Sequence, residues 1–311
     1  MIQIKIGNCR KLLKEIPRKS VQSTITSPPY YGLRDYGEDD QIGLEETPEE
    51  YVANLVEVFR EVRETLADDG TLWLNLGDSY YNYRPSVGKS YPKQTVSKTD
   101  QDLPSVSAKR NNKLKNLKEK DLIGIPWMVA FALRNDGWYL RQDIIWSKPN
   151  PMPESVVDRC TKSHEYIFLL SKNRNYYYDN EAIKEEATDW GTRDRTNGKY
   201  HNEGSGLSPQ TGLTKSYATR NKRSVWRVNP ANLKDAHFAT FPEKLILPMV
   251  LATTIPGETI LDPFAGSGTT GLVAGKHNRS AILIELNPDY KKIIDKRLEG
   301  DLFFSAETEG K

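Results

Sequence analysis

Short apolar, β-branched segments alternate with longer amphipathic segments along this chain. Ile2, Ile4 and Ile6 alternate with polar residues and predict a first strand. Similar patterns predict further strands at 21–26, 71–76, 138–146, 165–170, 259–262 and 280–285. Helical periodicity predicts helices at 12–16, from 47 to near Gly70, and at 125–134, 242–253, 267–274 and 288–298. The alternation predicts an α/β fold, with a doubly wound, mostly parallel sheet and helices on both faces.

A glycine turn follows the predicted strand at 259–262, in the sequence Asp262-Pro263-Phe264-Ala265-Gly266-Ser267-Gly268-Thr269-Thr270. Gly266 and Gly268 allow the backbone to turn sharply and to approach a ligand without a Cβ in the way. Ser267 is then placed to cap the following helix. A strand, a glycine turn and a helix N-terminus at the carboxyl edge of a sheet are typical of a site for a nucleotide-like ligand.

A second motif, Ser27-Pro28-Pro29-Tyr30, directly follows the predicted strand at 21–26. Two consecutive prolines have fixed φ and donate no backbone hydrogen bond, so the Pro28 carbonyl is held free beside the Ser27 hydroxyl. Two acceptors and the ring of Tyr30 suit the exocyclic amino group of a flipped-out base. The alternative is that the prolines only end the strand and that Tyr30 packs in the core.

Composition favours one large α/β domain with a smaller module. The chain has 311 residues, no apolar run long enough to span a bilayer, and no hydrophobic stretch typical of a signal peptide at its N-terminus. Its two cysteines, Cys9 and Cys160, are far apart and form no CxxC, so we expect neither a disulfide framework nor a metal site. We expect a cytoplasmic protein, bacterial, archaeal or phage-encoded.

The net charge of +2 conceals an uneven distribution. Residues 81–121 contain ten Lys or Arg against four Asp or Glu, and residues 189–234 contain nine against three. Each segment therefore carries +6, and the rest of the chain carries −10. Basic insertions on an acidic scaffold are expected where loops contact phosphates. Solvated, partly disordered loops are the alternative.

Together, the two motifs resemble those of the S-adenosylmethionine (SAM)-dependent amino-group DNA methyltransferases, the N4-cytosine/N6-adenine family. Ser-Pro-Pro-Tyr resembles the catalytic motif of that family, and the glycine turn resembles its cofactor motif. Their order along the chain is similar to the permuted β arrangement of the family. The resemblance is weakest in 81–121 and 185–234. It implies a catalytic half at 1–184, a target-recognition region at 185–236 and a SAM-binding half at 237–311.

The resemblance also implies roles for individual residues. Ser27, Pro28, Pro29 and Tyr30 would be catalytic. SAM would be bound by Asn8, Asp262, Phe264, Gly266, Gly268 and Glu285. Glu285 lies about twenty residues after the glycines, where doubly wound folds place an acid for ribose hydroxyls. Asn8 departs from the aspartate often found after the first strand, although its amide oxygen can still accept a hydrogen bond.

The resemblance implies double-stranded DNA as the partner, and a cognate restriction endonuclease that acts on the same site as a second one. It implies that the chain acts as a monomer or a homodimer. Candidate DNA contacts are Arg223, Trp226, Arg227, Lys113, Lys115 and Lys118. Trp226 could stack on nucleic acid, and burial in a small core is its alternative. Serine at the first motif position favours cytosine N4 over adenine N6. An RNA methyltransferase and an inactive SAM-fold DNA-binding protein are the two rival hypotheses.

Single residues argue against two other classes of enzyme, the P-loop phosphate-transfer enzymes and the cytosine-C5 methyltransferases. Gly266 and Gly271 have the glycine spacing of a P-loop, but Leu272 stands where that motif requires lysine. A cytosine-C5 methyltransferase requires a thiolate nucleophile. Neither Cys9 nor Cys160 follows a proline or lies in a turn like that at Ser27.

Overall fold

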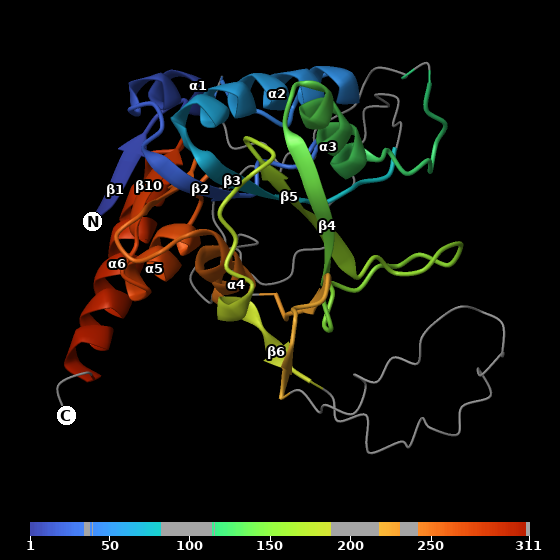
Figure 1. The fold of residues 1–311 in the computed structure, drawn as a ribbon. Helices are drawn as coiled ribbons and strands as arrows, with labels where there is room; N and C mark the ends of the chain where they lie inside the picture. Colours follow the sequence, from blue (N-terminus) through green and yellow to red (C-terminus); the bar gives the residue numbers. More distant parts are fainter. Residues whose placement is uncertain are drawn as a thin grey trace, which may run out of the picture.

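In the part of the chain that the structure describes, a central eight-stranded sheet organises the fold (Figure 1). In this computed structural model, the described residues are 1–33, 38, 40–81, 114, 116–187, 218–230 and 242–308. The strands of the sheet are β1 (Ile2–Ile6), β2 (Val21–Thr26), β3 (Leu66–Leu76), β4 (Tyr139–Ser147), β5 (His164–Ser171), β8 (Val225–Arg227), β9 (Thr259–Asp262) and β10 (Ser280–Glu285). Two short strands, β6 (Glu185–Glu186) and β7 (Thr219–Arg220), pair separately.

The helices are α1 (Cys9–Leu12), α2 (Pro48–Thr65), α3 (Ile125–Asn135), α4 (Glu243–Thr253), α5 (Thr269–Lys276) and α6 (Asp289–Thr308), with 3-10 turns at Leu13–Glu15 and Glu181–Ile183. Thr47 begins α2 through a capping box, in which its side chain accepts from Glu50 N and the Glu50 side chain accepts from Thr47 N. Among the helices of the described part of the chain, none is both long and apolar enough to cross a lipid bilayer.

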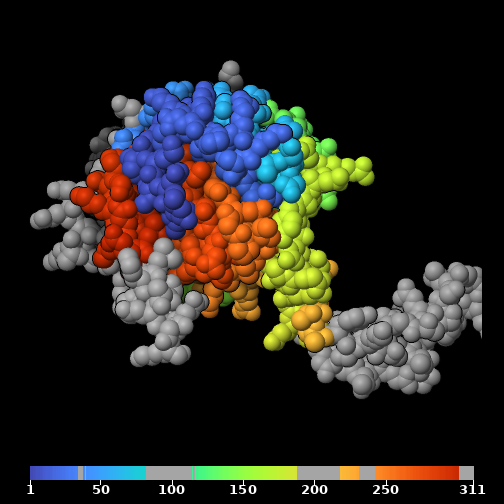
Figure 2. All heavy atoms as spheres, turned by 60° about the vertical axis from the view of Figure 1, so that its left-hand side comes forward, coloured from blue at the N-terminus to red at the C-terminus, as the bar shows by residue number. Residues whose placement is uncertain are grey.

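The strand order in the sheet is β1-β10-β9-β2-β3-β5-β4-β8. Pairing is parallel except where β5 runs antiparallel to β3 and to β4. The predicted mostly parallel α/β sheet is therefore confirmed. Two strands from the C-terminal part of the chain, β9 and β10, lie between β1 and β2. Figure 2 accordingly shows blue N-terminal and orange-to-red C-terminal segments in contact on one face.

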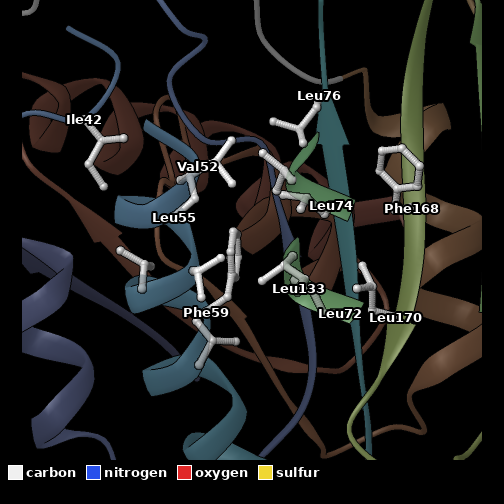
Figure 3. Packing of buried hydrophobic residues seen from close by; sticks show 14 of the residues in the cluster. Ile42, Val52, Leu55, Phe59, Leu72, Leu74, Leu76, Leu133, Phe168 and Leu170 are labelled. Atoms are coloured by element: carbon white, nitrogen blue, oxygen red, sulfur yellow. The ribbon is translucent and has the colours of Figure 1, made fainter. Parts of the chain in front are cut away.

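Alternate residues of the central strands face two hydrophobic cores. Leu72, Leu74 and Leu76 pack with α2 and α3 on one face, as Figure 3 shows. Trp73 points to the other face, where it packs with residues of α4 and α5. Because both faces are buried, the predicted cover of helices on each side is confirmed.

One helix boundary was predicted too late. The helix after Thr47 ends at Thr65 and β3 begins at Leu66, before the predicted boundary near Gly70. Leu66 has extended backbone angles, is fully buried and pairs with Val21 of β2. Burial against the neighbouring strand therefore draws this residue into the sheet, although the apolar spacing is helical up to that point.

Candidate active site

Two loops at the carboxyl edge of the sheet bring the sequence motifs together. Strands β2 and β9 are parallel neighbours, with Thr24 opposite Leu261. The Ser27-Pro28-Pro29-Tyr30 loop follows β2, and the glycine turn follows β9. The Thr26 hydroxyl donates to Asp262 Oδ1 at 2.7 Å, which links the two strand ends directly.

The glycine turn uses left-handed backbone conformations at both glycines. Gly266 has φ +51° and Gly268 has φ +77°. Gly268 itself is the N-cap of α5, and a Cβ on it would lie 2.8 Å from Ile294 Cγ2 of α6. Gly268 therefore packs closely against α6, and its close approach to a ligand stays a prediction.

The prediction that Ser267 caps α5 is wrong. The N-cap position is held by Gly268, and within the described residues no side chain caps this helix. The Ser267 hydroxyl instead accepts from Arg297 Nη1 at 2.8 Å, and the same guanidinium nitrogen donates to Thr269 Oγ1 at 2.7 Å. Arg297 of α6 thus holds the turn from outside.

Asp262 fixes the start of the turn. Its carboxylate is buried and accepts from the Thr26 hydroxyl, from Phe264 N at 3.1 Å and from the Thr270 hydroxyl at 2.7 Å. Burial raises the pKa of Asp262 from its ordinary value of 3.8 to about 6, while these hydrogen bonds oppose the rise. Asp262 therefore orients the turn.

Replacing Asp262 by asparagine should remove a pH dependence of stability. A raised carboxyl pKa favours the folded state below the unfolded pKa, and this contribution is lost as the pH rises through the folded value of about 6. Relative to Asp262→Asn, the wild type should lose about 3 kcal/mol of unfolding free energy between about pH 3 and pH 7. Urea unfolding of both proteins across this range measures the difference. Parallel pH profiles would contradict the assignment.

Glu285 and Asn8 close the other side of the turn, at the ends of β10 and β1. Glu285 Oε2 accepts from Gly266 N at 2.8 Å, and Oε1 accepts from Asn287 N at 3.0 Å. Burial raises the pKa of Glu285. Asn8 is the N-cap of α1, where its Oδ1 accepts from Arg10 N at 2.8 Å. Both side chains thus hold backbone at the edge of a cavity.

Tyr30 is fixed through its hydroxyl. It donates to Glu165 Oε2 at 2.6 Å and accepts from Asn75 Nδ2 at 2.8 Å, and Ser27 Oγ lies 3.4 Å away. Burial, followed by the Glu165 charge, raises the pKa of Tyr30 well above its usual range, so its hydroxyl stays protonated. Its ring lies against Gly77, where a Cβ would come within 2.5 Å of Cε2. Tyr30 therefore forms one wall of the site.

Sequence reasoning missed three side chains of this network, Asn75, Lys148 and Glu165. Lys148 forms an ion pair with Glu165, and its Nζ lies 4.4 Å from the centre of the Trp146 ring. Asn75 Nδ2 donates to Glu165 Oε2 at 2.8 Å, whereas its buried Oδ1 has no hydrogen-bond partner among the residues that the structure describes. The site thus holds one buried acceptor that remains available.

A single cavity joins both motifs. One end is lined by five of the six residues predicted for the cofactor, all except Gly268, and the other end is lined by the residues predicted for the base. The lining residues include Asn8, Arg10, Asp262, Phe264, Gly266 and Glu285 at the first end, and Ser27, Pro28, Pro29, Tyr30, Asn75, Trp146, Lys148 and Glu165 at the second. In the described ranges, no group of three His, Cys, Asp or Glu side chains is arranged to hold a metal ion.

The candidate DNA contacts are only partly brought to the surface. Trp226 is 5% exposed, packs against Trp73 and donates from Nε1 to Arg223 O at 2.8 Å. It belongs to the core, and the prediction that it stacks on nucleic acid is wrong because its ring is enclosed. Arg223, Arg227 and Lys118 are exposed, and Arg223 pairs with Glu185 at 2.5 Å. Lys113 and Lys115 lie outside the described residues.

Residues 21–296 match the model of a DNA methylase family, that of the N6/N4 enzymes. The chain is 46% identical over 296 residues to Type II methyltransferase M.Cfr9I of Citrobacter freundii, which covers 95% of this chain and 87% of the relative. It is 44% identical over 296 residues to Type II methyltransferase M.SmaI of Serratia marcescens. This alignment covers 95% of this chain and 90% of that relative.

Solved structures show the same fold. The PvuII DNA methyltransferase, described as cytosine-N4-specific, superposes with a TM-score of 0.63 at 19% identity, over 95% of this chain and 86% of its own. A putative DNA modification methylase of Thermus thermophilus, complexed with S-adenosyl-L-methionine, superposes with a TM-score of 0.60 at 22% identity. That superposition covers 97% of this chain and 95% of the other chain. The chain therefore belongs to the N6/N4 DNA methylase family of Type II DNA methyltransferases.

Proposed function

We propose that this chain transfers a methyl group from SAM to the exocyclic amino group of a base flipped out of double-stranded DNA, with cytosine N4 as the target. The cavity that joins the glycine turn to the Ser27–Tyr30 loop supports this proposal above all. A methyl donor held at one end and a base held at the other would meet inside it, so that alignment of the two supplies much of the rate.

The cofactor end has groups that suit SAM. A Cβ on Gly266 would meet no described atom within 4 Å, so the backbone there borders open space. Nearby, Nε and Nη2 of Arg10 are buried without a hydrogen-bond partner among the described residues, and can donate to acceptor nitrogens of an adenine ring. Phe264 and Glu285 also line this end. When bound, SAM supplies a methyl group already made electrophilic by its sulfonium.

The base end offers acceptors for an amino group. The lone pair of that amine is delocalised into the ring, so the amine is a poor nucleophile until its N–H groups are held. Ser27 Oγ, the Pro28 carbonyl and Asn75 Oδ1 are the acceptors that would hold them and direct the lone pair at the methyl group. Glu165 acts as a positioning residue, since it fixes both Tyr30 and Asn75.

Two observations favour cytosine N4. The first motif position is serine, Ser27, and the PvuII enzyme that shares the fold is described as cytosine-N4-specific. Adenine N6 is the alternative within the family, and an RNA methyltransferase is the more distant one. We assign target recognition to residues 185–236 and phosphate contact to the lysine-rich segment 81–121, in a chain that acts within a restriction–modification system beside a cognate endonuclease.

Expression in a methylation-free host, followed by single-molecule sequencing of the host DNA, tests the target base. We expect N4-methylcytosine at one short sequence, and none in cells that express Ser27→Ala. N6-methyladenine would replace the cytosine assignment by its alternative. Transfer of tritium from labelled SAM to duplex DNA, single-stranded DNA and RNA then separates DNA from RNA substrates. Transfer to RNA alone would overturn the proposal.

A further inference from the structure

A projecting loop joins the two strands that line the base end of the cavity. This arm, residues 149–163, leaves the sheet after Lys148, which directly follows β4, and it returns at the start of β5. Figure 1 shows it extending away from the body. Lys148 N donates to Ser163 O at 2.8 Å and closes the base of the arm. Strand β3 is parallel to β2 and antiparallel to β5, so the start of β5 lies at the same sheet edge as the end of β2. The arm therefore emerges at the same edge as the Ser27–Tyr30 loop.

The arm is braced. Pro149, Pro151 and Pro153 fix φ at three of its first five positions. Glu154 then accepts from Arg159 Nη1 at 2.6 Å and from Lys162 N at 3.1 Å, which ties the two sides of the arm together.

Two contacts also hold the arm against the body. The Arg159 guanidinium lies 4.0 Å from the centre of the Tyr80 ring, and Asp158 pairs with Lys120 at 2.6 Å. The projecting part of the arm is therefore held in one orientation before any partner binds, which lowers the entropy lost on binding.

Two apolar side chains project from this braced arm. Met152, which lies between Pro151 and Pro153, is 86% exposed, and Val157 is 102% exposed. Single exposed apolar residues are common on protein surfaces. These two are distinguished by their place, because both project from a stiffened loop that lies between Lys148 and Glu165, and these two residues line the base end of the cavity.

We propose that Met152 and Val157 form a wedge that enters the DNA duplex beside the flipped base. This inference rests on the proposed function, since it requires a base to occupy the cavity. Extrusion of a base leaves an apolar gap between the neighbouring base pairs, and proteins that distort DNA fill such gaps with side chains such as Met, Leu or Ile. The partner of the arm is therefore the duplex at the site of methylation.

The double variant Met152→Ala/Val157→Ala tests the wedge on DNA duplexes that carry the methylated sequence, which the sequencing experiment under Proposed function identifies. One duplex has the target base paired normally, and a second has it mispaired, so that extrusion costs less. We expect kcat/KM to fall at least tenfold on the paired duplex and less than threefold on the mispaired one. Ile255→Ala, which truncates a side chain 48% exposed between α4 and β9, should match the wild type on both.

Each outcome decides one question. Equal losses of kcat/KM on both duplexes in the double variant, or no loss on either, would overturn the wedge. The proposed function would still stand in that case, provided that the wild type methylates the DNA. A wild type that methylates no DNA would overturn the proposed function, and the wedge with it. Calorimetric titration of SAM into the double variant should give wild-type affinity, because the arm lies outside the cofactor end.

Discussion

Substitution of Gly266 by aspartate should abolish SAM binding while the fold persists. No described atom lies within 4 Å of a Cβ built on Gly266, so a side chain there would enter open space without a clash. Its φ of +51° lies in the left-handed region that aspartate tolerates better than most residues. The added carboxylate would lie beside Glu285 and occupy the cofactor end. We expect SAM affinity, measured by calorimetry, to fall at least about 100-fold.

Gly257 provides a matched control for this variant. It also has positive φ, +91°, no described atom lies within 4 Å of a Cβ built on it, and it is exposed in the turn before β9. That turn lies at the opposite edge of the sheet from the cavity. Gly257→Asp should therefore bind SAM as the wild type does. Unchanged SAM affinity in Gly266→Asp, with normal thermal unfolding, would show that the cofactor end is misplaced.

The fold was predictable because its elements carry local signals. Apolar alternation marked the strands, and the capping box at Thr47 marked the start of α2. Strand β8 carries too little local signal. Its three residues lie in a polar segment, and they become a strand only by pairing with β4, where Trp146 lies opposite Trp226. The same nonlocal pairing places the Trp226 ring in the core, which no local pattern could indicate.

The candidate site was only half visible in the sequence, for the same reason. Ser27–Tyr30 and the glycine turn are contiguous motifs, so their chemistry can be read directly. Asn75, Lys148 and Glu165 stand on or directly after three different strands, and only the order β3-β5-β4 brings them together. Their signal was a polar side chain at the end of an apolar strand, which many exposed strand ends share. Without the pairing, nothing selects these three.

Tyr30→Ala should nearly abolish methyl transfer while SAM affinity stays within about threefold of the wild type. Loss of a stacking ring costs about 1–3 kcal/mol, or about 5- to 150-fold in rate. The substitution also removes the hydroxyl that accepts from Asn75 and donates to Glu165, so the Asn75 amide would lose one of the contacts that orient it. We therefore expect methyl transfer to fall at least about 100-fold. Transfer of tritium from labelled SAM to duplex DNA measures it.

Tyr30→Phe separates the ring from the hydroxyl. It keeps the ring against Gly77 but leaves Glu165 Oε2 without the donor at 2.6 Å. A hydrogen bond to a charged acceptor contributes about 1.5–3 kcal/mol, so a drop in the rate of methyl transfer of about 10- to 150-fold is expected from this change alone. A larger loss in the alanine variant than in the phenylalanine variant assigns the difference to the ring. If Tyr30→Ala transfers methyl groups at close to the wild-type rate, the base does not bind beside Tyr30, and this side chain serves only to pack the loop.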